Sequence, residues 1–110
     1  MTIYALASGS SKSGIGVIRI SGPDTKKVIS KLTNGSFPKP RIATLKKINK
    51  INNNELIDEG IIIWFPGPQS YTGEDMAEFH VHGSRSVIEA IHNSISKIEN
   101  CKMAEPGEFT

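Results

Sequence analysis

Apolar and polar residues alternate along several short stretches of the chain, and this period of two predicts β-strands. Three consecutive asparagines, residues 52–54, separate two of these stretches and predict a hairpin turn. Residues 61–65 are apolar on both faces, so we expect that strand to lie inside the sheet. The predicted strands are residues 2–7, 15–20, 41–49, 56–65, 76–82 and, more briefly, 102–104.

A second period, close to 3.6 residues, predicts helices. The first helix is expected to start at Ser21-Gly22-Pro23-Asp24, where a capping residue, a proline and an acid suit a helix N-terminus, and to end at Asn34-Gly35. The second is capped by Ser84 and carries aliphatic residues at helical spacing as far as Ile98. Together the pattern predicts an α/β domain of the α+β type, a mixed sheet of about five strands with two to three flanking helices.

Length and composition add a few exclusions. The 110 residues suffice for one domain with one core. The single cysteine, Cys101, excludes an internal disulfide framework and a multi-cysteine metal site. The longest aliphatic and aromatic run, residues 61–65, is far shorter than a membrane span, and no signal peptide follows Met1. We therefore expect a cytoplasmic protein without membrane contact.

The net charge of +2 hides an uneven distribution. Residues 1–50 hold ten Lys and Arg and one acid, whereas residues 51–110 hold three Lys and Arg and ten acids. Such a split is typical of two halves that lie side by side, and it also suits a basic face for nucleic acid. No basic motif with interleaved aromatic residues supports the second interpretation, and charge alone leaves both open.

The Ser/Gly-rich loop at residues 8–14 lacks the chemistry of a phosphate-binding loop. Gly9 and Gly14 have the spacing of that motif's two glycines, but Ile15-Gly16 stands where lysine and a hydroxyl residue are required. A strand is predicted to follow, so no helix N-terminus faces the loop. Nucleotide binding is therefore disfavoured here.

The stretch from Ser70 to Gly83 concentrates the candidate chemistry, with three carboxylates and two imidazoles in fourteen positions. Alternation from Met76 onward assigns its side chains to two faces. One face is predicted to be core, and the other is predicted to face a ligand. The core face holds Ala77, Phe79 and Val81, and the ligand-facing row holds Met76, Glu78, His80 and His82.

Two chemistries suit this row. Glu78, His80 and His82 follow at two-residue steps, as ligands of one zinc ion do when a further ligand comes from elsewhere. Alternatively, Glu78 accepts two parallel hydrogen bonds from a flat heterocycle with adjacent N–H donors, such as guanine or a pterin. Glu74 and Asp75 better suit a structural role at a backbone turn. Nucleophilic catalysis has no local signature, because no serine or cysteine is tied to a base in the sequence.

Arg19 is the odd residue of the strand at 15–20. Alternation places it on the face of Ile15 and Val17, where a guanidinium needs an anion or access to water. Two interpretations remain, an arginine that reaches solvent at a strand end and a clamp for an anion or ligand.

Six motifs follow one another along the chain. They are Gly14–Pro23 (GIGVIRISGP), Leu56–Gly60 (LIDEG), Phe65–Pro68 (FPGP), Ser70–Asp75 (SYTGED), Glu78–Gly83 (EFHVHG) and Pro106–Thr110 (PGEFT). In their order and spacing, nearly the whole chain resembles the N-terminal domain of the MnmE (TrmE) family of tRNA modification GTPases. The chain departs from the family pattern at Ser84, where a second glycine is commoner, and at residues 8–13, where prolines are frequent.

The resemblance implies a domain related to the tetrahydrofolate domain of the glycine-cleavage T protein. Such a domain binds a reduced folate, 5-formyl-tetrahydrofolate or a close relative, and forms a homodimer. The family protein acts with the flavoprotein MnmG (GidA) and installs an aminomethyl-type group at C5 of the wobble uridine of certain tRNAs, using a folate-derived one-carbon unit. GTP, with Mg and K, belongs to a separate GTPase domain of the parent, so the resemblance implies no chemistry by this chain alone.

By the same resemblance, two residues of this chain are folate ligands. Arg19 matches the arginine of the family's R-I-S-G motif, and Glu78 matches the glutamate that follows its T-G-E-D motif. A lysine beyond the P-G-E-F motif is a third ligand in the family and has no counterpart before Thr110. We therefore expect residues 1–110 to be a single folate-binding and dimerisation domain, truncated near its C-terminus, without the parent's helical and GTPase domains.

Two alternatives stay open on the residues themselves. One is an RNA-docking and dimerisation module whose basic first half contacts RNA without folate. The other, less favoured, is a zinc hydrolase that uses Glu78, His80 and His82.

Overall fold

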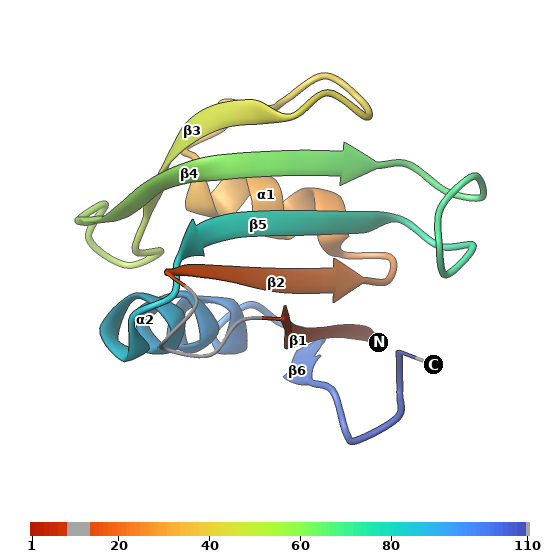
Figure 1. The fold of residues 1–110 in the computed structure, drawn as a ribbon. Helices are drawn as coiled ribbons and strands as arrows, with labels where there is room; N and C mark the ends of the chain where they lie inside the picture. The colour runs from red at the N-terminus through yellow and green to blue at the C-terminus, as the bar shows by residue number, and fades with distance from the viewer. Residues whose placement is uncertain (9–13, 110) are drawn as a thin grey trace.

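A six-stranded sheet organises the chain in the computed structural model, which describes residues 1–8 and 14–109 (Figure 1). The strand order is β3-β4-β5-β2-β1-β6, and only the β1–β6 pair is parallel. The glycine spacing discussed for the loop at 8–14 falls largely on residues 9–13, which lie outside the described residues. The elements are β1 (Thr2–Ser8), β2 (Ile15–Ser21), α1 (Thr25–Leu32), β3 (Thr44–Asn49), β4 (Leu56–Phe65), β5 (Met76–His82), α2 (Arg85–Ser96) and β6 (Cys101–Met103).

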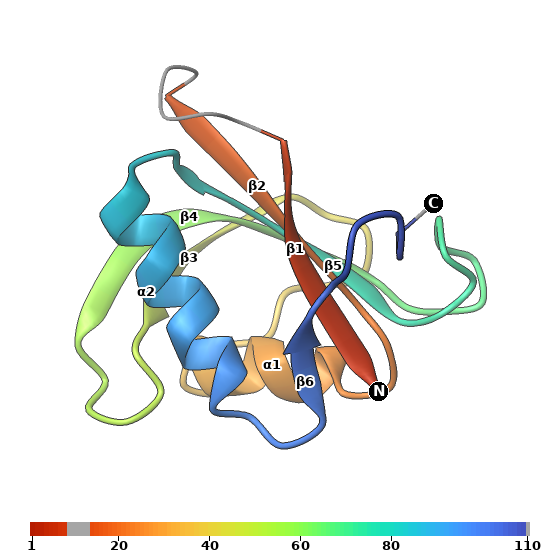
Figure 2. The ribbon, with the colours of Figure 1, turned by 90° about the horizontal axis from the view of Figure 1, so that it is seen from below.

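Both helices lie on the same side of the sheet, as the view from below shows (Figure 2). Helix α1 buries Val28, Ile29 and Leu32, the aliphatic stripe that its helical spacing predicts. Helix α2 starts as predicted, because the Ser84 hydroxyl accepts a hydrogen bond from the backbone N–H of Val87 at 3.4 Å. The sheet therefore has one helix-covered face and one face without helices, which we call the open face.

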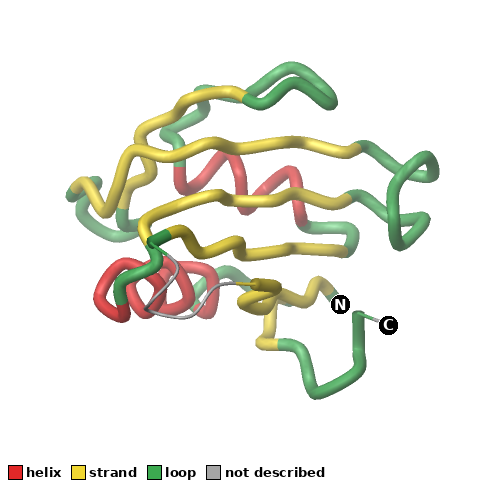
Figure 3. Tube along the Cα trace, in the orientation of Figure 1, coloured by secondary structure: helices red, strands yellow, loops and turns green. Residues whose placement is uncertain are grey.

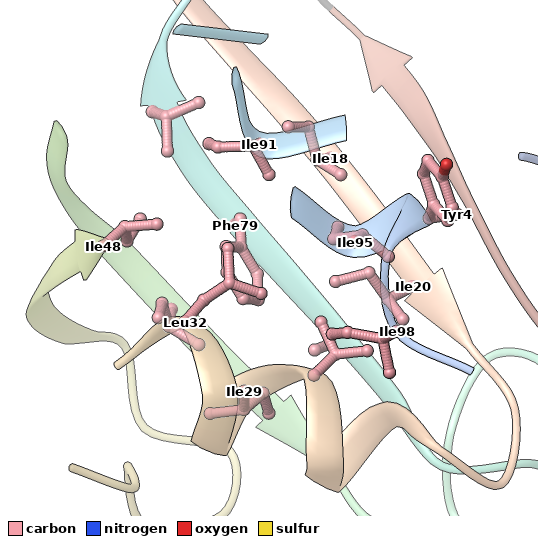
Figure 4. Close-up of a cluster of buried hydrophobic side chains, with 14 of the residues drawn as sticks. Tyr4, Ile18, Ile20, Ile29, Leu32, Ile48, Phe79, Ile91, Ile95 and Ile98 are labelled. Carbon is pink, nitrogen blue, oxygen red and sulfur yellow. The ribbon is translucent and has the colours of Figure 1, made fainter. Parts of the chain in front are cut away.

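The core lies between the sheet and the two helices (Figure 4). Phe79 of β5 is fully buried and projects toward the centre of this cluster, between Leu32 and Ile29 of α1 and Ile95 of α2. Because its neighbours Glu78 and His80 point to the opposite face, the packing of Phe79 fixes where those polar side chains stand.

The predicted fold class is confirmed, with differences at the element boundaries. The strand expected from residue 41 begins at Thr44, because Arg41 adopts a positive φ of 61° that no regular strand contains. The last short strand is shifted by one residue to Cys101–Met103. Met76 belongs to the predicted ligand-facing row but is only 2% exposed, so it is not available to a ligand.

Apolar side chains of β4 lie half-buried on the open face of the sheet. In β4, Ile62 and Trp64 are buried under the helices, whereas Ile61 and Ile63 on the open face are half-buried. The strand lies inside the sheet, between β3 and β5, as its apolar run predicts. The apolar residues on its second face are covered by no helix and lie beside the polar row of β5.

The oppositely charged halves of the sequence are interleaved in space (Figure 1). Strand β2 from the basic half lies next to β5 from the acidic half, and β3 pairs with β4 in the same way. Arg19–Glu78 and Lys50–Glu55 are ion pairs that cross the two halves. In the part of the chain that the structure describes, no helix has the length and apolar character needed to cross a membrane.

His92 of α2 packs its ring against Tyr4 of β1, with ring centroids 5.3 Å apart. Its Nε2 atom is buried and has no hydrogen-bond partner among the described residues. Burial lowers the pKa of His92 below its ordinary value, because a charged imidazolium would lose its hydration there.

We expect the protein to lose stability as the pH falls below about 6.5, the pKa of a histidine in the unfolded chain. In that range the unfolded state binds a proton at His92 that the folded state disfavours, so acid favours unfolding. Urea unfolding at pH 7 and pH 5 of the wild type and of His92→Phe, which keeps an aromatic ring, measures this. The variant should lose less stability between the two pH values, and an equal loss would contradict the assignment.

Candidate functional site

Strand register brings the two predicted site residues together. In the antiparallel β2–β5 pair, Arg19 lies directly opposite Glu78, and on the other side Ile63 of β4 lies opposite Glu78. All three side chains stand on the open face. The two predicted folate ligands are therefore neighbours on a rigid, central part of the sheet.

The Glu78 carboxylate is held by two partners, one at each oxygen. Arg19 Nη2 donates to Glu78 Oε2 at 3.0 Å, and His80 Nε2 lies 3.0 Å from Glu78 Oε1. The Glu78 side chain is 19% exposed, compared with 30% for Arg19 and 32% for His80. We call these three residues the Glu78 cluster.

Glu78 is anionic at neutral pH. Burial alone would raise the pKa of its carboxyl group, but the hydrogen bonds from His80 and Arg19 and the charge of Arg19 outweigh burial and hold the pKa below its ordinary value. Since a carboxylate only accepts hydrogen bonds, the His80 nitrogen that faces it carries the proton. The Glu78 cluster thus presents a fixed negative charge that is flanked by the Arg19 guanidinium and the His80 imidazole.

Tyr71 places an aromatic ring beside the cluster. The Arg19 guanidinium carbon lies 5.7 Å from the centre of the Tyr71 ring, within the range of a cation–π contact. The ring is otherwise largely open, since Tyr71 is 72% exposed. Arg19 is therefore held between a carboxylate and an aromatic face, and its Nε atom is buried without a hydrogen-bond partner among the described residues.

The loop at 66–75, drawn in green between β4 and β5, carries Tyr71 (Figure 3). Asp75 fixes its far end, because the carboxylate accepts from the backbone N–H of Gly67 at 2.9 Å and the Asp75 carbonyl accepts from Gly22 N–H at 2.9 Å. The structural role predicted for Asp75 at a backbone turn is confirmed by these contacts. The loop is thus tied to the start of α1, which positions Tyr71.

Glu74 has a different role from the one predicted. Its carboxylate accepts from the Ser21 hydroxyl at 3.4 Å, and that hydroxyl is also 2.8 Å from the Thr72 hydroxyl. Glu74 therefore links the loop to the end of β2 through side chains, and within residues 1–8 and 14–109 no backbone N–H donates to its carboxylate.

His82, the third member of the predicted zinc set, is engaged elsewhere. Its Nδ1 atom lies 2.8 Å from Asp58 Oδ1 on β4, whereas His80 turns to Glu78. Among residues 1–8 and 14–109, no group of three or more His, Cys, Asp or Glu side chains is arranged to hold a metal ion. The geometry therefore gives the zinc interpretation no support.

Comparison with protein families settles the relationship of the chain. The model of the family described as "GTP-binding protein TrmE N-terminus" matches residues 2–110. This chain belongs to the TrmE N-terminus family. The resemblance seen in the six sequence motifs is thereby confirmed.

Similar curated proteins carry related names. The tRNA modification GTPase MnmE of Pelagibacter ubique is 70% identical over 110 residues, and that of Beijerinckia indica is 46% identical over 109. The mitochondrial 5-taurinomethyluridine-tRNA synthase subunit GTPB3 of Danio rerio is 46% identical over 109 residues. These matches cover 99% to 100% of this chain but only 22% to 25% of the relatives. The chain therefore spans about a quarter of the length of these relatives.

For a TrmE N-terminus, the structure adds two site residues that sequence reasoning did not single out. Tyr71 faces Arg19, and Asp58 holds His82. His80, which the sequence placed in the ligand-facing row, holds Glu78. Asp58 had one visible signal, since it and the adjacent Glu59 are the two acids of a predicted strand whose other side chains are apolar. No signal in the sequence indicates the contact of Tyr71 with Arg19, because this contact depends on how the loop at 66–75 folds back over β2.

Proposed function

We propose that this chain binds a reduced folate, 5-formyl-tetrahydrofolate or a close relative, at the Glu78 cluster on the open face. The observation that carries the proposal is the anionic Glu78 carboxylate, partly buried and flanked by Arg19 on a rigid sheet. A fixed carboxylate of this kind suits the adjacent N–H donors of a pterin ring.

The residues present fit such a ligand. A carboxylate offers about four acceptor positions, and Arg19 and His80 occupy two of those of Glu78. In the part of the chain that the structure describes, no other group donates to Glu78, so its remaining positions suit pterin N–H groups. The buried Arg19 Nε–H lacks an acceptor among the described residues, and a ligand oxygen or nitrogen would supply one. When bound, the folate supplies a one-carbon unit.

We assign the chain to a larger tRNA-modifying GTPase, on the strength of its family and of the names of its relatives. We propose a cytoplasmic location for that protein as well. In that protein the chain would also form a homodimer, which is supported by large apolar side chains in contact with solvent, Ile15 at 59% and Leu45 at 60% exposure. The partners would be the flavoprotein MnmG and tRNA. GTP, with Mg and K, would be bound by a domain outside residues 1–110, and the product would carry a C5 aminomethyl-type group on the wobble uridine.

Substitution of Glu78 tests the folate proposal. We expect Glu78→Ala to weaken 5-formyl-tetrahydrofolate binding about 10- to 150-fold, because hydrogen bonds to a charged group contribute about 1.5 to 3 kcal/mol. Isothermal titration calorimetry measures this, on residues 1–110 and on a longer product of the same reading frame that extends past the P-G-E-F motif. Glu78→Gln, which keeps the shape of the side chain, should lie between the wild type and Glu78→Ala.

Glu89→Ala is the matched control, because Glu89 is an exposed carboxylate on α2, away from the open face. It should bind folate as the wild type does. Equal affinity of the wild type and Glu78→Ala would refute the site. Binding of tRNA with a steep salt dependence, without any folate binding, would favour the RNA-docking module instead.

A further inference from the structure

Arg41 connects the loop at 66–75 to the sheet. Its Nη2 atom donates to the backbone carbonyl of Pro66 at 3.1 Å and to that of Gln69 at 2.7 Å. Its own backbone N–H donates to the carbonyl of Trp64 in β4 at 2.7 Å, so the residue that holds the loop is itself fixed to the sheet. One exposed side chain therefore joins β4 to the middle of the loop.

The backbone conformation of Arg41 is unusual for an arginine. Its φ of 61° lies in the left-handed region, which glycine adopts freely and which costs free energy for a residue with a long side chain. Such conformations cluster at ligand clamps and switch regions, where surrounding contacts hold them. Glycine would serve the turn alone better, so what an arginine adds at this position is its side-chain contact with the loop.

Tyr71 lies between two points at which the loop is held (Figure 3). Gln69 is held from the β4 side by Arg41. Thr72 is held from the β2 side, because its hydroxyl lies 2.8 Å from the hydroxyl of Ser21. Two residues of the chain separate these points, and Tyr71 is one of them. The two contacts together therefore leave the Tyr71 backbone little freedom.

The position of the Tyr71 ring matters for the surface around the Glu78 cluster. The ring centre lies 5.7 Å from the guanidinium carbon of Arg19. Tyr71 also lines a cavity of about 450 Å³, together with Ser21, Thr72 and Glu74 among others. Because Tyr71 is 72% exposed, its own packing does little to hold the ring in place. The hydrogen bonds of the loop therefore decide where the ring stands.

We propose that Arg41 is a positioning residue for the Glu78 cluster and that it acts through Tyr71. The Arg41 guanidinium holds the loop at 66–75 against β4, and the held loop places the Tyr71 ring beside Arg19. Without the guanidinium the loop keeps its contacts with β2 and α1, but the ring is free to turn into solvent. The placement of Tyr71 needs no ligand, whereas its effect on affinity at the cluster rests on the proposed function.

Arg41→Gly separates the side chain from the turn, because glycine suits the positive φ at this position. In ligand-free protein we expect the nuclear Overhauser contacts between the Tyr71 ring and the Arg19 side chain to weaken severalfold. The backbone amide signals of β2, β4 and β5 should stay as in the wild type.

Two further variants control for charge. Arg41→Lys keeps the charge but replaces the planar guanidinium by an ammonium, so it should restore the contacts between the Tyr71 ring and Arg19 only in part. Arg85→Ala removes an arginine that is 88% exposed on α2, away from the loop, and should match the wild type.

A double-mutant cycle tests whether Arg41 acts through Tyr71. We expect Tyr71→Ala to weaken 5-formyl-tetrahydrofolate binding about two- to fivefold, the effect of an exposed cation–π contact that holds Arg19 ready, and Arg41→Gly by no more than that. The double variant should bind as Tyr71→Ala does, because Arg41 has nothing left to position. Calorimetry on the same two chain lengths as for Glu78→Ala measures these affinities.

The inference is overturned if Arg41→Gly keeps the contacts between the Tyr71 ring and Arg19, or if the loss in the double variant is the product of the two single losses. A failure of the proposed function looks different, because the wild type and Glu78→Ala then bind folate equally or not at all. In that case the ligand-free spectra of Arg41→Gly still decide whether Arg41 positions Tyr71.

Discussion

Phe79→Ala is expected to lower the free energy of unfolding by about 3 to 5 kcal/mol, the range for removing a buried aromatic side chain from a core. Phe79 is fully buried at the point where both helices meet β5. A domain of this size has a total stability of about 5 to 15 kcal/mol, so this loss is a large part of it. Chemical denaturation followed by tryptophan fluorescence, using Trp64, measures the change.

Leu56→Ala is the control for this prediction. Leu56 is also an apolar strand residue, but it is 54% exposed. Leu56→Ala should therefore lower the free energy of unfolding by less than about 0.5 kcal/mol. A loss below about 1.5 kcal/mol for Phe79→Ala would mean that the core collapses around the cavity. In that case Phe79 would not be what positions Glu78 and His80.

Gly60→Ala is expected to destabilise the protein by about 3 kcal/mol or more, at the upper end for overpacking. An added Cβ at Gly60 would stand 2.4 Å from the backbone carbonyl oxygen of His80 and 3.1 Å from Val81 Cγ1. The backbone of His80 cannot move away from this Cβ unless β4 and β5 separate. The same separation would pull Asp58 away from His82, so the loss of stability should be accompanied by loss of the Asp58–His82 contact, which NMR spectra of the His82 ring report.

Gly16→Ala tests whether the backbone contact is the cause. There the added Cβ would stand 2.8 Å from Ile88 Cδ1, the end of a flexible side chain that is able to rotate away. We expect this variant to lose less than half of what Gly60→Ala loses. Similar losses at both positions would show that strand glycines matter here through general chain stiffness and not through the β4–β5 approach.

Local patterns in the sequence predict most of the elements, because each pattern depends on burial of one face. The alternation around Phe79 and the helical spacing of Val28, Ile29 and Leu32 both correspond to buried faces. The boundaries of the elements are less predictable. The sequence predicts a strand over residues 41–49, but the observed strand is Thr44–Asn49. The positive φ of Arg41, which delays its start, cannot be recognised from the pattern of apolar residues.

The site was only partly predictable for a related reason. Arg19 and Glu78 were each singled out, from charge on an apolar face and from family motifs. That they neutralise each other depends on the β2–β5 register, which no local pattern encodes. The predicted zinc set illustrates the opposite case, since Glu78, His80 and His82 share one strand yet the sheet supplies His82 with Asp58 as a separate partner.

The strand order has a consequence for synthesis on the ribosome. Arg19 and Glu78 are 59 positions apart in the sequence, and the strand edge of β2 that faces β5 stays unpaired until β5 has emerged. Strand β1 likewise meets its outer neighbour β6 only when residues 101–103 are available. Pairings over such distances are slow, and open strand edges are prone to aggregate. The nascent chain therefore exposes open strand edges during the interval in which its Glu78 cluster does not yet exist.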